Sequence, residues 1–145
     1  MKRIIWSLAT GLILISCIPS YYKDGPNCHH AINIVNNSDI ALYTGRYNDP
    51  NYAPYIYRKR VMPHSVSSPA LTSSGCFEDL FRDGTYLITF FDAKVIDYLD
   101  ANTPAGVQRP YDQAVLYNVY ITLEDMQHSN WTVTFPPEDS SSIPE

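Results

Sequence analysis

The sequence predicts an all-β fold: a single antiparallel β-sandwich, immunoglobulin-like or transthyretin-like, with one or two short helical turns. Three observations lead to this class. Six or seven short runs are rich in β-branched and aromatic residues, and most alternate between two faces, as expected of strands. Turn residues separate the runs, and no long segment has helical periodicity. The alternative is a closed barrel.

The first two strands are predicted at 31–35 and 39–43. In the first, Ile32 and Ile34 share one face. The turn-forming residues at 36–38 lie between the two runs, so we expect the strands to form a hairpin.

Two further strands are expected before residue 75. After a long loop over 44–54 the extended pattern resumes at 55–57, and 65–71 predicts another strand. Pro69 cannot donate a ladder hydrogen bond, which places 65–71 at a sheet edge. Residues 75–81 then predict a helical turn or a bulged bend.

The run 85–91 is apolar on both faces apart from its threonines, which indicates a central strand. Apolar residues at 95, 96 and 99 have helical spacing, so we expect a short helix or turn within 92–100. A loop over 101–113 follows.

The last strands are predicted at 114–121 and 131–135. Between them, Thr122 and Asp125 have the spacing of an N-cap and its acidic partner, which predicts one helical turn over 123–128.

The start of the chain predicts export and lipidation. Residues 1–16 contain Lys2 and Arg3, an uncharged apolar run, and a small residue before Cys17, as a lipoprotein signal peptide does. The run is too short to span a bilayer, which takes about 20 residues. Cys17 would carry acyl chains such as palmitate. Two or three chains anchor a protein firmly, because each buried CH₂ contributes about 0.8 kcal/mol. The other divisions are the tether 17–27, the domain 28–137 and the disordered acidic tail 138–145.

The net charge of the chain without residues 1–16 limits its possible partners. Removal of residues 1–16 takes two basic residues and no acid, so 129 residues with 8 basic and 15 acidic side chains remain, a net charge of −7. Nucleic acid is therefore excluded as a partner, since phosphate binding needs a basic face. We expect the protein at the outer membrane, on its periplasmic face or at the cell surface.

Cys28 and Cys76 remain as an even pair in an exported chain, so they could form a disulfide worth up to roughly 4 kcal/mol. Two unpaired thiols are the alternative. A zinc site at Cys28, His29 and His30 is less favoured, because adjacent ligands do not readily meet tetrahedral geometry. No metal or other cofactor is expected.

Four segments carry a resemblance: Cys76-Phe77-Glu78-Asp79-Leu80-Phe81, residues 120–137, the turn Asn36-Asn37-Ser38-Asp39, and Phe90-Phe91-Asp92-Ala93. In these segments the chain resembles a group of small envelope lipoproteins of gut Bacteroidetes. The resemblance covers nearly all of the domain and implies a compact envelope domain. It implies no activity and no catalytic residues.

Tyrosines and a basic run suggest a binding surface rather than a catalytic site. The chain has 12 tyrosines, and five fall between 43 and 57. Tyrosine suits binding faces for sugars or proteins, because its ring is apolar and its tip is polar; packing within the sandwich is the alternative. The candidate binding residues are Tyr47, Tyr52, Tyr55, Tyr57, Arg58, Lys59 and Arg60. The basic run among them could steer an acidic partner or protect an edge strand.

The function expected from these features is a non-catalytic, lipid-anchored module that binds an envelope protein or glycan. One alternative is a glycan-acting hydrolase with carboxylates from separate loops, such as Asp92 with Asp125. The other is a structural subunit of an envelope complex. The chain has no Gly-rich phosphate loop, HExxH, GxSxG or CxxC motif.

Overall fold

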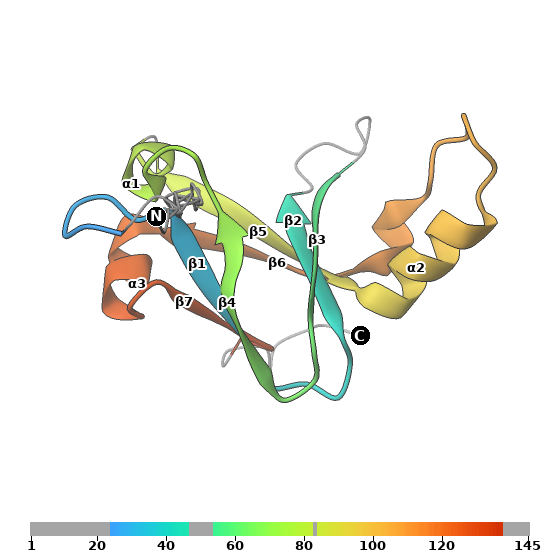
Figure 1. The fold of residues 1–145 in the computed structure, drawn as a ribbon, viewed down its shortest axis with the longest axis horizontal. Helices are drawn as coiled ribbons and strands as arrows, with labels where there is room; N and C mark the ends of the chain where they lie inside the picture. Colours follow the sequence, from blue (N-terminus) through green and yellow to red (C-terminus); the bar gives the residue numbers. More distant parts are fainter. Residues whose placement is uncertain (1–23, 47–53, 83, 138–145) are drawn as a thin grey trace, which may run out of the picture.

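The computed structural model describes residues 24–46, 54–82 and 84–137. This part of the chain is mostly β, with two mostly antiparallel sheets (Figure 1). The predicted signal peptide, Cys17 and the predicted acidic tail lie outside the described residues. The strands are β1 (Ala31–Asn36), β2 (Leu42–Arg46), β3 (Tyr55–Val61), β4 (Ser65–Thr72), β5 (Thr85–Asp92), β6 (Val115–Thr122) and β7 (Thr132–Phe135). The helices are α1 (Phe77–Leu80), α2 (Ala93–Asn102), the 3₁₀ helix η1 (Tyr111–Ala114) and α3 (Leu123–His128).

The two sheets have the strand orders β4-β1-β7 and β3-β2-β5-β6. The predicted central position of β5 and the predicted edge position of β4 are both confirmed. The main core cluster contains side chains from both sheets, among them Ile34 of β1 and Phe90 of β5. The two sheets therefore share one hydrophobic core.

The predicted hairpin between the first two strands is wrong, because β1 and β2 belong to different sheets. The side chain of Asn36 explains the crossing. It is fully buried and its amide donates to the carbonyls of Ile40 at 2.7 Å and Met62 at 3.0 Å. Its Oδ1 accepts the backbone N–H of Ser38 at 3.0 Å. A buried amide satisfied in this way stabilises an arch between the sheets instead of a hairpin turn.

The last strand also departs from the expected antiparallel pattern. β7 pairs with β1 in parallel, with Ile34 opposite Val133. The helix α3 makes this possible, because it carries the chain from the four-stranded sheet to the three-stranded one. Asn130 and Trp131 both have positive φ, 51° and 57°, and complete the reversal into β7.

The predicted helical segments are confirmed, and their caps follow from the sequence. Asp92 accepts the backbone N–H groups of Lys94 and Val95 at the start of α2. Thr122 and Asp125 form a complete capping box at the start of α3. Figure 1 shows α1 and α3 at one end of the molecule and α2 at the opposite end.

Gly45 lets β3 approach β2 closely. A Cβ atom at this position would meet the carbonyl oxygen of Tyr55 at 2.1 Å, a distance that no side chain tolerates. β3 and its tyrosines therefore depend on this glycine for their place at the edge of the sheet.

Candidate cleft between the edge strands β3 and β4

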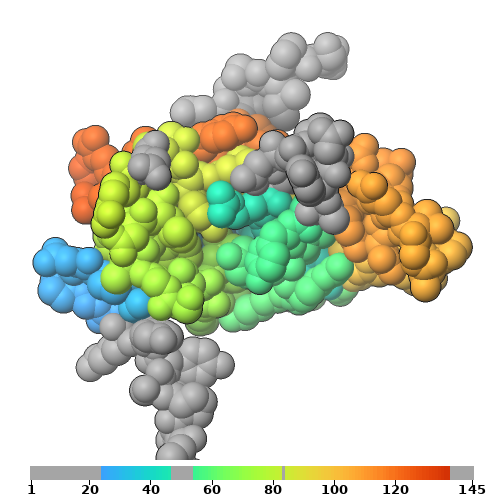
Figure 2. All heavy atoms as spheres, turned by 90° about the horizontal axis from the view of Figure 1, so that it is seen from above, coloured from blue at the N-terminus to red at the C-terminus, as the bar shows by residue number. Residues whose placement is uncertain are grey.

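A hollow lies between the edge strands of the two sheets, β3 and β4. Its volume is about 610 Å³. Figure 2 shows the face on which β3 and β4 lie next to each other, with residues 24–30 towards one end and α2 towards the other. The lining residues are Asp24, His30, Ala31, Tyr57, Arg58, Lys59, Pro69, Ala70, Thr72 and Ser73.

One side chain bridges the two walls of this cleft. The ammonium of Lys59 on β3 donates to the carbonyl of Pro69 on β4 at 2.7 Å. Among the described strands, β3 is hydrogen-bonded to β2 alone, and β4 to β1 alone. The facing edges are thus linked at this point by a side chain and not by a strand ladder.

Tyr57 supplies the aromatic surface of the cleft. Burial, followed by the neighbouring Tyr86, raises the pKa of Tyr57 well above its usual value, so this hydroxyl stays protonated at neutral pH. The ring of Tyr55 meets Tyr57 edge to face, with 4.9 Å between the centroids. The residue Tyr55 is 65% exposed and extends the aromatic surface outwards.

The structure brings together part of the predicted binding set. Tyr57, Arg58 and Lys59 line the cleft, and Tyr55 lies beside it. Tyr47 and Tyr52 fall outside the described residues. Arg60 lies elsewhere, in a hollow of about 360 Å³ beside Asp92 and Asp97.

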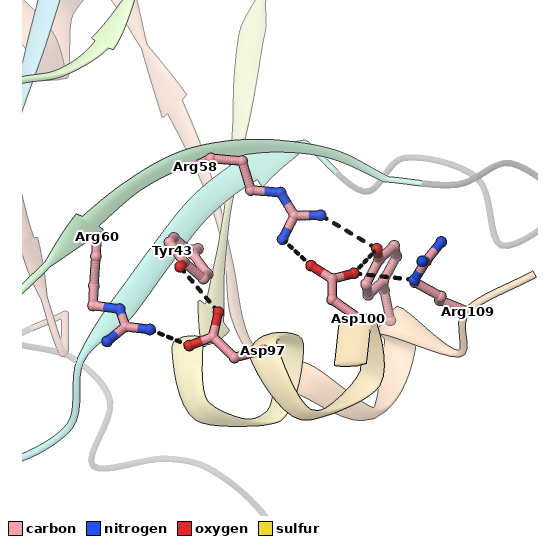
Figure 3. Close-up of polar contacts among 7 residues, drawn as sticks. Tyr43, Arg58, Arg60, Asp97, Asp100 and Arg109 are labelled. Atoms are coloured by element: carbon pink, nitrogen blue, oxygen red, sulfur yellow. Dashed lines mark hydrogen bonds and ion pairs between the residues drawn. The ribbon is translucent and has the colours of Figure 1, made fainter. Parts of the chain in front are cut away.

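The guanidinium groups of the basic run bind α2, which the sequence did not suggest (Figure 3). Arg58 donates to Asp100 at 2.6 Å and to the hydroxyl of Tyr111 at 3.3 Å. Arg60 pairs with Asp97, which also accepts a hydrogen bond from Tyr43 at 3.0 Å. The two arginines therefore hold the helix against the sheet, and among these three basic residues Lys59 alone bridges the cleft.

Asp100 is the centre of this network. Burial raises its pKa, but hydrogen bonds from Tyr111 and Arg58 and the charges of Arg58 and Arg109 outweigh burial and lower the pKa below its usual value. Asp100 is consequently ionised at neutral pH and pairs with both arginines.

Sequence reasoning missed the opposite wall and the end of the cleft. That surface comes from β4, from the segment after it, and from Asp24 and His30 before β1. The turn from β3 into β4 brings β4 opposite β3, and the pairing of β1 with β4 brings Asp24 and His30 to the end of the cleft. No local sequence motif marks either contact. Pro69, which lies within β4, is the one sequence signal for this wall, because it predicts a strand at a sheet edge.

A disulfide joins Cys28 to Cys76 beside the cleft, with 4.8 Å between the Cα atoms. Next to it, Nδ1 of His29 lies 2.6 Å from Oε1 of Glu78, and the backbone N–H of His29 donates to Oε2 at 2.9 Å. The His29 ring stacks on Trp131 at 4.1 Å between centroids. A second hollow of about 400 Å³ adjoins this pair.

The two carboxylates considered for catalysis, Asp92 and Asp125, have structural roles. Asp92 and Asp125 cap α2 and α3. Thr122, the N-cap residue of α3, pairs with the first residue of β5, whereas Asp92 ends that strand. An eight-residue strand is roughly 25 Å long, so these two carboxylates cannot flank one glycosidic bond, which requires about 5–9.5 Å. Glu78 is bound to His29, and Asp79 to Arg82.

Comparisons with protein-family models, with curated proteins and with solved structures gave no match. Within residues 24–46, 54–82 and 84–137, no helix has the length and apolar character needed to cross a bilayer.

Proposed function

We propose that this protein is a non-catalytic, lipid-anchored lipoprotein of the bacterial outer membrane that binds a glycan in the cleft between β3 and β4. The cleft itself carries the proposal. A volume of about 610 Å³ falls in the range of small-ligand sites, roughly 300–1,000 Å³, which favours a few sugar units over a folded partner.

The chemistry of the cleft favours a saccharide. Tyr57 and Tyr55 offer ring surfaces for the apolar faces of sugars. Polar groups surround these rings: Lys59 and Thr72 can donate, and Asp24 can accept. A sugar carries hydroxyl groups all round an apolar ring face and needs such a mixture.

The architecture proposed for this module is a β-sandwich, with the two sheets packed face to face. The shared core cluster supports it, since residues of β1, β4 and β7 pack with residues of β2, β3, β5 and β6. In this arrangement β3 and β4 form one open side of the sandwich, and the cleft is the space between the sheets on that side.

Lipidation of Cys17 would keep the cleft near the membrane. Asp24, which lines the cleft, is seven residues after Cys17. Seven residues span at most about 25 Å when fully extended. The ligand would therefore be bound close to the bilayer surface.

An extended peptide is the second candidate ligand. Both walls of the cleft are edge strands, and an edge strand can accept a further strand from a partner. Pro69 removes one donor from β4, so a peptide would pair with β3.

The test uses two matched tryptophan substitutions at exposed edge positions. Thr72→Trp places a large side chain at the cleft, whereas Asn118→Trp changes β6 on the far edge of the four-stranded sheet. The purified mature protein with Cys17→Ser is applied to envelope glycan and peptide arrays. The proposal predicts saccharide binding that Thr72→Trp abolishes and Asn118→Trp leaves intact. Binding that survives Thr72→Trp, or the absence of any saccharide binding, would contradict it.

A further inference from the structure

Three side chains that can bind metal lie together at the end of the cleft. The Sγ atoms of Cys28 and Cys76 and a ring nitrogen of His30 all lie within 4.8 Å of one another. Nε2 of His30 is 3.2 Å from Sγ of Cys28. All three residues are half-buried.

The His30 ring is oriented for metal binding. Its Nδ1 lies 3.2 Å from the carbonyl oxygen of Gly75. A carbonyl can only accept, so in the neutral ring Nδ1 carries the proton and Nε2 directs its lone pair towards the sulfur atoms. Histidines that bind metals are commonly held in this way, with the second nitrogen donating to a backbone carbonyl.

The two segments that carry the three residues are also held together without the disulfide. The backbone N–H of Phe77 donates to the carbonyl of His29 at 2.8 Å, and the N–H of Ser73 donates to the carbonyl of His30 at 2.9 Å. The carboxylate of Glu78, two residues after Cys76, also binds His29, which follows Cys28. Reduction of the disulfide therefore leaves several contacts that keep Cys28 close to Cys76.

We propose that Cys28, His30 and Cys76 bind a zinc ion when the disulfide is reduced. A thiol or phosphine reductant supplies two electrons, the S–S bond breaks, and two protons are taken up to give two thiols. Zinc then binds both sulfurs as thiolates and both protons are released.

The geometry of tetrahedral zinc fits a small adjustment of this site. Zn–S distances near 2.3 Å and Zn–N distances near 2.0–2.1 Å place the donor atoms roughly 3.5–4 Å apart. Nε2 and the Cys28 sulfur, 3.2 Å apart, are already near this spacing, and the two sulfurs must separate from their bonded distance to reach it. The fourth position is left to water, which reaches the site from the cleft that His30 lines. The disulfide and the zinc site exclude one another.

The experiment titrates the mature chain carrying Cys17→Ser, reduced with a phosphine under anaerobic conditions. Cobalt(II) serves as the spectroscopic probe and zinc as the competitor. We expect one cobalt per chain with thiolate-to-cobalt charge-transfer absorption, displaced by zinc, and no such absorption from the disulfide form. His30→Ala should weaken binding at least tenfold, and His64→Ala, on an exposed turn, should not change it.

Three results would overturn the inference. The first is a reduced chain that binds no cobalt. The second is His30→Ala binding cobalt as tightly as the unchanged sequence. The third is a reduced chain that loses its strand signal in circular dichroism and does not regain it with zinc. His30→Gln, which keeps a polar side chain of similar size, checks that a loss in His30→Ala comes from the missing ligand.

Discussion

The carboxylate of Glu78 binds two atoms of His29: one oxygen lies 2.6 Å from the ring Nδ1, and the other accepts the backbone N–H at 2.9 Å. The pair joins the segment before β1 to helix α1, 49 residues later in the chain. The pair lies beside the disulfide, and the His29 ring stacks on the ring of Trp131. The Glu78 carboxylate thus links the segment before β1 to α1, the helix that lies between β4 of one sheet and β5 of the other.

Replacement of Glu78 by Gln should lower the free energy of unfolding at pH 7 by about 1.5–3 kcal/mol, the usual range for hydrogen bonds to a charged group. Urea unfolding measures the loss. Glu124→Gln is the matched control, because Glu124 is exposed on α3. An equal, small loss in both variants would show that the Glu78 contacts do not stabilise the fold.

The contribution of Glu78 to stability should depend on pH. Burial raises the pKa of Glu78, but the hydrogen bonds from His29 outweigh burial and the pKa is lower than usual. A lowered pKa in the folded state contributes stability above the unfolded pKa, near 4.3, that is lost as the pH falls through the folded value. The unfolding free energies of the unchanged sequence and of Glu78→Gln should therefore differ at pH 7, and the difference should shrink as the pH falls below the unfolded pKa. A constant difference between pH 7 and pH 3 would contradict this.

Asn36 should be indispensable to the arch between β1 and β2. Asn36→Asp keeps the size of the side chain but removes the donor that Ile40 and Met62 require. We expect a loss of about 2–4 kcal/mol, because two carbonyls lose their partner and a charge is buried. Thermal unfolding measures it against Asn37→Asp, an exposed neighbour. A similar melting temperature for the two variants would argue against a structural role for the amide.

Asp100→Asn should loosen α2 without unfolding the sheets. The variant weakens the contacts with Arg58, Tyr111 and Arg109. Partly exposed ion pairs contribute little each, so the global loss should be near 1 kcal/mol. Hydrogen exchange should rise in residues 93–102 and stay constant in β5. Asp112→Asn, at an exposed residue of η1, serves as the control. Equal exchange in the two variants would contradict the role of Asp100 in holding α2.

Cys17→Ser tests the anchor. Loss of the acyl chains should move the protein from the membrane fraction to the soluble fraction, and metabolic labelling with a palmitate analogue should disappear. A Cys17→Ser protein that stays with the membrane would disprove lipid anchoring at this residue.

Local structure could be predicted from the sequence because alternation and capping are local properties. The central strand around Phe90 and the capping box of Thr122 and Asp125 both follow from neighbouring residues. The partners of β1 could not be predicted in the same way. Asn36 has the turn chemistry of a hairpin, but its burial depends on carbonyls from the β3–β4 turn, 26 residues away.

The candidate site was predictable on one wall only. Tyr57 and Lys59 belong to a sequence cluster that suggested binding, whereas Thr72 and Asp24 join them through the tertiary fold. Arg58 and Arg60 share that cluster but bind α2. A basic run on a strand alternates between two faces, and sequence composition does not show which face meets a helix.

Site-specific photocrosslinking in the native cells tests the central claim most directly. A photoreactive amino acid replaces Thr72 at the cleft or, as the control, Asn118 on β6, in the full-length protein. The account predicts a discrete adduct from position 72 that contains carbohydrate and is absent from position 118. No adduct from position 72, or the same adducts from both positions, would contradict a ligand bound between β3 and β4.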